Sequence, residues 1–238
     1  MAFATASRTS QLFTTAATSY TVTLPAVNSG DLILVCTATR VGTTDISGYT
    51  LIMARGNAGF GLASVFAKIS DGTETTAVVT NSSSGVCATI VYKVSGWGGS
   101  ITNDIDYAGG ESLSSTSPSV GVTAGWGADD NLVLSFCGAG DDSATFTSFP
   151  SGFTDTFQIQ TDTGRDASAE VASCQRQITA GSITVGSYTL AELEQIGTVS
   201  LIIKPGTSGG GATGPNTPVN PSITSLLATS ARLNWEQG

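Results

Sequence analysis

Two nearly continuous apolar runs, separated by about a hundred residues, constrain the fold of this chain more than any other feature. The first covers residues 31–38 and follows a turn at residues 28–30, and the second covers residues 130–137. Short runs of this kind, bounded by Asn, Gly and Asp, fit strands that are buried on both faces. A helix would need a longer run with helical periodicity. The two runs therefore predict a central strand in each half of a β-sandwich.

Shorter strands are expected around each apolar run. Residues 20–24 and 65–69 alternate as half-buried strands do, and turn residues separate them from their neighbours. The second half repeats the strand patterns of the first half in the same order; for example, Arg176 matches Lys68. We therefore expect an all-β, jelly-roll-like antiparallel β-sandwich with an internal pseudo-repeat and roughly eight to ten strands. Chance similarity among short strands is the alternative explanation of the repeat.

Changes in composition divide the chain into segments. The Ser-, Thr- and Ala-rich residues 1–17 suggest an N-terminal arm that packs on the domain or on a neighbour, and the sandwich domain follows at residues 18–205. Gly and then Pro dominate residues 206–220, as is typical of a linker. Residues 190–196 locally favour a helix, so they are expected to form a helical turn or an irregular edge strand.

Charge and residue content exclude several classes of function. The chain has 238 residues, a formal charge of −9 and no His. The acidic balance argues against nucleic acid as a partner, because its recognition depends on clustered Lys and Arg. The lack of His excludes Ser-His-Asp and Cys-His catalysis, and no phosphate-loop or dinucleotide motif is present, so no cofactor is expected. Neither a membrane-spanning segment nor a secretory signal is expected.

The four cysteines all fall inside expected strands and lack the paired spacing of a metal site. They are Cys36, Cys87, Cys137 and Cys174. We expect buried free thiols that behave as small apolar side chains. One or two disulfides are the alternative.

The candidate contact residues are two tryptophans and two aspartates. Trp97 and Trp126 each lie in a Gly-Trp-Gly segment, where an indole can stack on a sugar, cover the end of the core or fill a subunit contact. Asp104 and Asp106 form one of three acidic pairs, beside those at residues 129–130 and 141–142. Paired carboxylates can serve glycoside hydrolysis or bind Ca²⁺, although Asp is also a common turn residue. These four residues are candidates for a glycan or subunit contact, and no catalytic or metal-binding residues are expected.

Several motifs resemble those of a group of bacteriophage virion proteins that are built on a β-sandwich. They comprise the alternating first strand and residues 25–35, 47–51, 88–92, 126–132 and 201–205. Residues 221–238, which include Trp235, resemble the first two strands of a fibronectin type III module. Such modules often follow the sandwich in this group.

The resemblance implies a non-enzymatic structural protein on the surface of a phage particle. This would be a capsid decoration or head-fibre protein, or a tail-fibre module, acting in particle assembly, stabilisation or host-surface attachment. The implied partners are other virion proteins, further copies of the chain, with a trimer as one common arrangement, and host-surface glycans. The implied location is the virion surface, after synthesis in the host cytoplasm without a signal peptide. A carbohydrate-binding, lectin-like module is the alternative, and an enzyme ranks third.

Overall fold

The computed structural model describes residues 2–41, 44–57, 61–140, 145–161 and 168–206. Within these ranges the chain forms fourteen strands and no helix, which confirms the prediction of an all-β fold. The described residues belong to one compact unit, Met1–Thr207. The predicted linker beyond Gly206 and the predicted fibronectin-like segment at 221–238 lie outside the described residues. Throughout the part described, no helix has the length and apolar character needed to cross a membrane.

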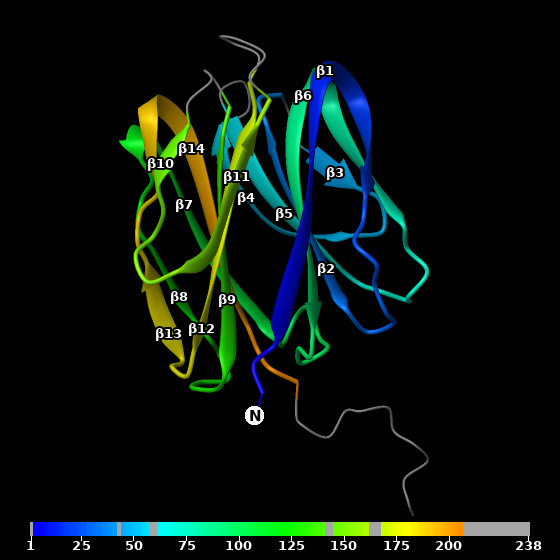
Figure 1. The fold of residues 1–238 in the computed structure, drawn as a ribbon, viewed down its shortest axis with the longest axis vertical. Helices are drawn as coiled ribbons and strands as arrows, with labels where there is room; N and C mark the ends of the chain where they lie inside the picture. The colour runs from blue at the N-terminus through cyan, green and yellow to red at the C-terminus, as the bar shows by residue number, and fades with distance from the viewer. Residues whose placement is uncertain (1, 42–43, 58–60, 141–144, 162–167, 207–238) are drawn as a thin grey trace, which may run out of the picture. The chain divides into compact units, whose positions relative to one another are not determined.

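The first sheet is built only from the first half of the chain (Figure 1). Its neighbouring strands are antiparallel, and the first apolar run of the sequence forms its middle strand, β2. The order across the sheet is β1 (Thr5–Thr23), β6 (Thr76–Ser95), β2 (Leu32–Thr39), β5 (Gly61–Ile69) and β4 (Thr50–Asn57), with the short β3 (Thr44–Ile46) also paired to β6.

The second sheet uses the second half of the chain in the same way. The order across it is β7 (Ile105–Thr116), β14 (Thr189–Ile203), β9 (Asn131–Ala139), β12 (Glu170–Ile178) and β11 (Thr154–Gln160), with β10 (Phe146–Ser148) also paired to β14. A separate two-stranded ribbon consists of β8 (Val120–Thr123) and β13 (Ser182–Val185). In the first half, the corresponding ribbon is formed by the far ends of β1 and β6, which are residues 19–23 and 76–80. The second half therefore divides into more strands than expected.

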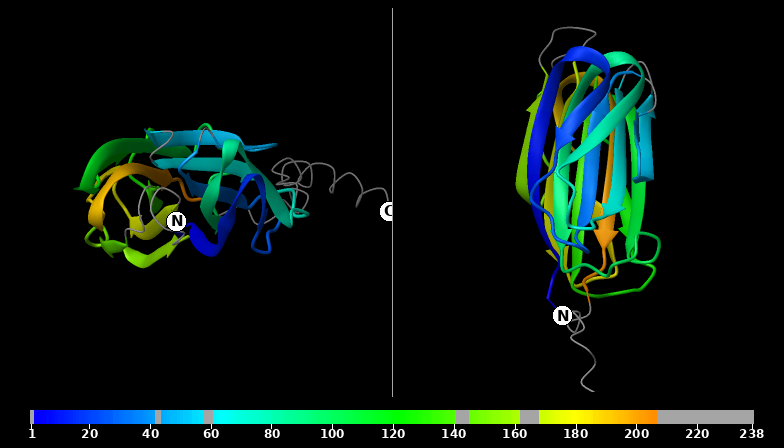
Figure 2. Two further views of the ribbon diagram at one scale, coloured as in Figure 1. Left: turned by 90° about the horizontal axis from the view of Figure 1, so that it is seen from above. Right: turned by 90° about the vertical axis from the view of Figure 1, so that its right-hand side faces the viewer.

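The two sheets share one pairing order and one register, which confirms the predicted pseudo-repeat. Lys68 in β5 faces Ile33 in β2, and Arg176 in β12 faces Val133 in β9, so the predicted match of Lys68 with Arg176 is confirmed. The edge strands β4 and β11 also carry irregularities at corresponding points. Figure 2 shows the two halves packed against each other along their length.

Both faces of the two central strands are buried, as the apolar runs predicted. Every residue of β2 and of β9 is buried. One apolar core lies between the sheets and includes Leu34, Tyr92, Leu134, Phe136 and Val199. The outer faces are covered by the far ends of β1 and β6 in the first half, and by β10 and the β8–β13 ribbon in the second. The result is an antiparallel β-sandwich with a covered outer face on each sheet.

Two segments differ from their local sequence pattern. Residues 5–17, expected as part of an arm, belong to β1 and pair with β6 from Thr5 to Phe13, so they form an edge strand of the sandwich. The signal is weak because the inward positions near its start hold the small Ala4 and Ala6. Residues 190–196 belong to β14, because pairing with β7 and β9 overrides the local preference for a helix.

Candidate functional site

The four candidate contact residues gather around Lys204 at one end of the sandwich. The Lys204 Nζ lies 3.5 Å from an Asp104 carboxylate oxygen and 5.9 Å from the centroid of the Trp126 ring. The backbone N–H that follows Trp97 donates to the Lys204 carbonyl at 2.9 Å. Asp106 accepts a hydrogen bond from the N–H that precedes Trp126 at 2.6 Å. The four residues singled out in the sequence therefore lie at the same end of the sandwich.

The two indoles of this end cluster are engaged in packing. Trp97 is only 6% exposed, belongs to the core between the sheets and donates from Nε1 to the Gly30 carbonyl at 2.9 Å. Trp126 is half-buried, packs on the outer face of the second sheet and donates from Nε1 to the Asn131 side chain at 2.9 Å. Stacking on a sugar requires an accessible ring face, and Trp97 offers none. The geometry thus assigns Trp97 to the core.

The carboxylates of the end cluster stabilise turns. Asp104 is 8% exposed and accepts the Ser100 N–H at 3.0 Å, which fixes the turn before β7. Asp129 accepts the Asp130 N–H at 2.8 Å in the turn before β9. The third acidic pair, at residues 141–142, lies outside the described residues. Among the residues that the structure describes, no group of three or more His, Cys, Asp or Glu side chains is placed to hold a metal ion.

The four cysteines are free and buried, as predicted. Burial raises the pKa of the Cys87 thiol and of the Cys174 thiol to about 12, and it raises the pKa values of the Cys36 and Cys137 thiols as well. Thiols with such pKa values remain protonated at neutral pH and are poor nucleophiles. The cysteines therefore act as apolar core residues.

One side of the sandwich is closed, because strands from both sheets touch near β4 and β7. This approach depends on glycine: a Cβ at Gly197 would lie 2.6 Å from the Arg55 carbonyl carbon and closer still to its oxygen. Glu111 of β7 then accepts a hydrogen bond from the Gly56 N–H of β4 at 2.9 Å. The backbones of the two sheets leave no room for a ligand here.

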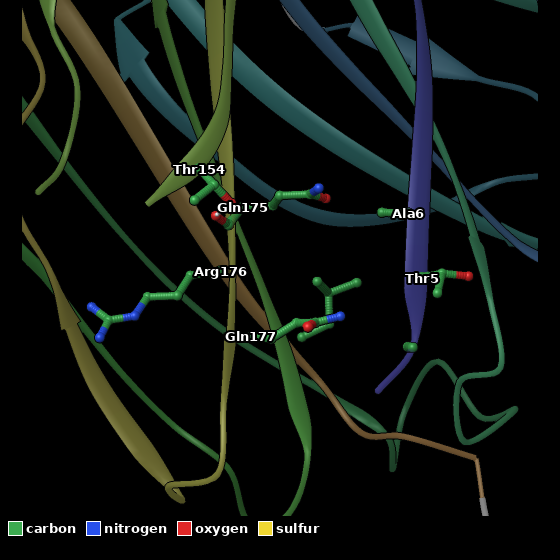
Figure 3. A pocket seen from close by; sticks show the side chains of 8 residues that line it. Thr5, Ala6, Thr154, Gln175, Arg176 and Gln177 are labelled. Atoms are coloured by element: carbon green, nitrogen blue, oxygen red, sulfur yellow. Dashed lines mark hydrogen bonds between the residues drawn. The ribbon is translucent and has the colours of Figure 1, made fainter. Parts of the chain in front are cut away.

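The opposite side of the sandwich, between β1 and the β11–β12 pair, is a groove (Figure 3). Its central hollow has a volume of about 260 Å³. Figure 3 shows Gln175 and Gln177 reaching from β12 toward β1, whereas Arg176 points away. The floor is apolar and the walls carry amides and hydroxyls. The lining residues are Ala4, Thr5, Ala6, Leu132, Thr154 and residues 175–177.

An ion pair between Arg8 and Asp155 joins β1 to β11 farther along the groove. The Arg8 guanidinium also lies 4.6 Å from the centroid of the Phe157 ring. Burial by itself would lower the pKa of Arg8, but the hydrogen bond to Asp155, together with the interactions with the charge of Asp155 and with Tyr92, outweighs this effect and raises that pKa. Asp155 has a φ of 50°, the one positive φ of a non-glycine residue in the described ranges. This backbone conformation lies in the irregular part of β11 and directs the carboxylate toward β1.

The groove residues were not predicted from the sequence, although the repeat contains a signal for them. The shared register places Gln175 and Gln177 at the positions that Ala67 and Ile69 occupy in the first half. A buried alanine and an exposed isoleucine of the first half thus correspond to amides in the second half. At positions where the repeat is broken in this way, the requirements of the fold alone do not determine the side chain.

Comparisons with models of protein families, with curated proteins and with solved structures find no match to this chain. The resemblance to phage virion proteins thus stays a prediction from motifs. Function is inferred below from these motifs and from the geometry of the molecule.

Proposed function

We propose that this chain is a non-enzymatic structural protein of a bacteriophage particle surface that acts through shape and contact. The observation that carries the proposal is the place of the resembling motifs in the fold. Residues 25–35 include the turn into β2, residues 88–92 lie within β6, and residues 126–132 lead into β9. The resemblance thus concerns central strands and their entry turns, which are architectural features.

The surface supports a role in a repeated assembly. Charged residues make up only 11% of the chain, so few charges oppose close packing of copies. Leu113 in β7 and Leu193 in β14 are 66% and 65% exposed. Leu113 pairs with Gln195, and Leu193 lies two residues before Gln195 in the irregular part of β14. An exposed apolar pair of this kind suits a contact with another copy of the chain, as in a trimer, or with another virion protein.

Mass spectrometry of purified phage particles tests this proposal. The chain should be present at a fixed high ratio to the major capsid protein after gradient purification and a high-salt wash. Replacing both Leu113 and Leu193 with Asp should lower incorporation while leaving the fold intact, because both side chains are exposed. Val78→Asp, at an exposed position in β6, is the matched control. Absence of the chain from washed particles would overturn the proposal.

A carbohydrate-binding module is the second candidate function, and the groove between β1 and β11 favours it. The indole of Trp97 is buried, so the site expected around Trp97 and Trp126 does not provide a pair of stacking platforms. Amides and hydroxyls in the groove provide different chemistry for the same class of ligand. This possibility is developed next.

A further inference from the structure

The groove between β1 and the β11–β12 pair breaks the internal symmetry of the sandwich, because the corresponding side near β4 and β7 is closed. We propose that this groove binds a neutral, linear oligosaccharide, with Gln175 and Gln177 as its principal hydrogen-bonding residues. The proposal does not depend on a location in a phage particle. It assigns a carbohydrate site to residues outside the end cluster.

Gln175 is the central polar group of the groove. Its Oε1 atom is enclosed and has no hydrogen-bond partner among the described residues. An enclosed amide oxygen without a partner is unfavourable, so a rotation of the Gln175 side chain that brings Oε1 into the hollow, where a ligand hydroxyl can donate to it, would stabilise the complex. Gln177 is exposed two residues farther along the same face of β12. Each amide both donates and accepts, which matches the hydroxyl groups of a sugar.

The charge of the groove favours a neutral ligand. Arg8 is paired with Asp155, and the Arg176 side chain points away from the hollow (Figure 3). Within the central hollow, a sulfated or uronic-acid sugar would therefore lack a cation directed at it, although Arg176 lines the neighbouring hollow. A strongly basic ligand would find a single carboxylate, which Arg8 already neutralises.

The shape of the groove favours a linear ligand. A second hollow of about 430 Å³ shares Arg176 and Gln177 with the first and extends to Phe3. A third, of about 460 Å³, is lined by residues 8–10 of β1 together with Asp155 and Phe157. The first and third hollows thus lie along β1, whereas the second lies before its first residue, at Phe3, and along β12 and β13. Each hollow is near the range of roughly 300–1,000 Å³ usual for small-ligand sites. Ala6, which is partly exposed, can contact the C–H face of a sugar ring.

An extended peptide is the competing occupant, because β1 is an edge strand and such edges can pair with an added strand. The paired amides of β12 favour the sugar. Added strands are held chiefly by backbone hydrogen bonds, which do not require glutamines on the facing wall. The two occupants are distinguished by the experiment below.

The test begins with the full chain on an array that holds neutral oligosaccharides, acidic oligosaccharides and extended peptides. We expect retention by at least one neutral oligosaccharide, which is then titrated by calorimetry. The double variant Gln175→Ala, Gln177→Ile copies the residues Ala67 and Ile69 of the first half. It should fold normally and bind about tenfold more weakly or worse, because two hydrogen-bonding amides are lost.

A matched pair of threonine variants supplies the control. Thr154 lines the groove, whereas Thr50 occupies the corresponding position at the closed side. Thr154→Ala should weaken binding severalfold, and Thr50→Ala should leave it unchanged. The proposal is overturned by retention of acidic sugars or peptides alone, by no retention, or by full binding of the double variant.

Nuclear magnetic resonance gives a second readout that does not depend on a variant. Titration of the labelled full chain with the same oligosaccharide should shift the side-chain amide signals of Gln175 and Gln177. The signal of Gln195, which lies in β14 away from the groove, should stay in place. Shifts confined to the end cluster around Trp126 would contradict the assignment.

Discussion

The substitution Gly197→Ala tests the closed side of the sandwich. Gly197 lies in β14, where its backbone approaches β4 of the other sheet. An added Cβ would lie 2.6 Å from the Arg55 carbonyl carbon and 3.1 Å from the Gly56 nitrogen. Ordinary contacts of a Cβ begin near 3.4 Å. Because the obstacles are backbone atoms of a paired strand, they cannot rotate away, and the two sheets must separate locally.

The expected cost follows from this overlap. Overpacking in a well-packed interior costs about 1–3 kcal/mol, and a backbone obstacle places this variant near the upper end. A loss of about 3 kcal/mol lowers the melting temperature of a domain of this size by roughly 6–12 °C. Thermal unfolding followed by circular dichroism in the far ultraviolet measures this shift. The loss of the hydrogen bond between the Gly56 N–H and Glu111 would add to it.

Gly121→Ala is the matched control for this experiment. Gly121 also lies in a strand, β8, but a Cβ there would meet nothing within 4 Å. Alanine is the better strand residue, so this variant should melt at the wild-type temperature or slightly above it. If Gly197→Ala also melted within about 2 °C of the wild type, the close approach of the two sheets would be refuted.

Buried and paired groups give three more predictions. Desolvation alone would raise the pKa of Glu74, but hydrogen bonds, above all from Lys68, outweigh it and hold this pKa below its ordinary value. Glu74→Gln should therefore lower the stability to urea at pH 7. The difference from the wild type should shrink as the pH falls below about 4, because the carboxylate then becomes protonated in the unfolded chain while it stays ionised in the folded one. All four thiols are buried, and burial raises the pKa of Cys87 to about 12. Dithionitrobenzoate should therefore label no thiol until the chain is denatured. Rapid labelling of the native chain would contradict the buried positions. Leu34→Asp should unfold the domain at a cost of about 4 kcal/mol or more, whereas Leu113→Asp should change its stability by about 0.5 kcal/mol or less. Circular dichroism and urea unfolding measure both effects. A folded Leu34→Asp variant would disprove the assigned core.

The sequence predicted the parts of the fold that depend on long apolar runs. The runs that became β2 and β9 are buried on both faces, and their pairing with β5 and β12 follows one register. The first part of β1 was harder to recognise. An edge strand needs few apolar residues, and small residues such as Ala6 satisfy its inward positions without a clear alternating pattern.

The residues of the end cluster stood out in the sequence by their type, whereas those of the groove did not. Asp104, Asp106, Trp97 and Trp126 stand out by residue type, and their common place at one end follows from the turns that carry them. The groove forms because the edges of the two sheets touch near β4 and β7, whereas they stay apart between β1 and β11. That difference depends on contacts between halves of the chain, such as the backbone approach at Gly197. No local pattern encodes such a contact, and only a comparison of the two halves reveals it.

Hydrogen exchange with mass spectrometry measures directly whether the groove is the binding surface. The full chain is compared with and without the neutral oligosaccharide selected on the array. Binding in the groove should slow exchange at residues 5–9 of β1 and at residues 173–177 of β12, and leave β4 and β7 unchanged. Slower exchange at β4, at β7 or at the end cluster, with β1 and β12 unaffected, would contradict the assignment of the groove.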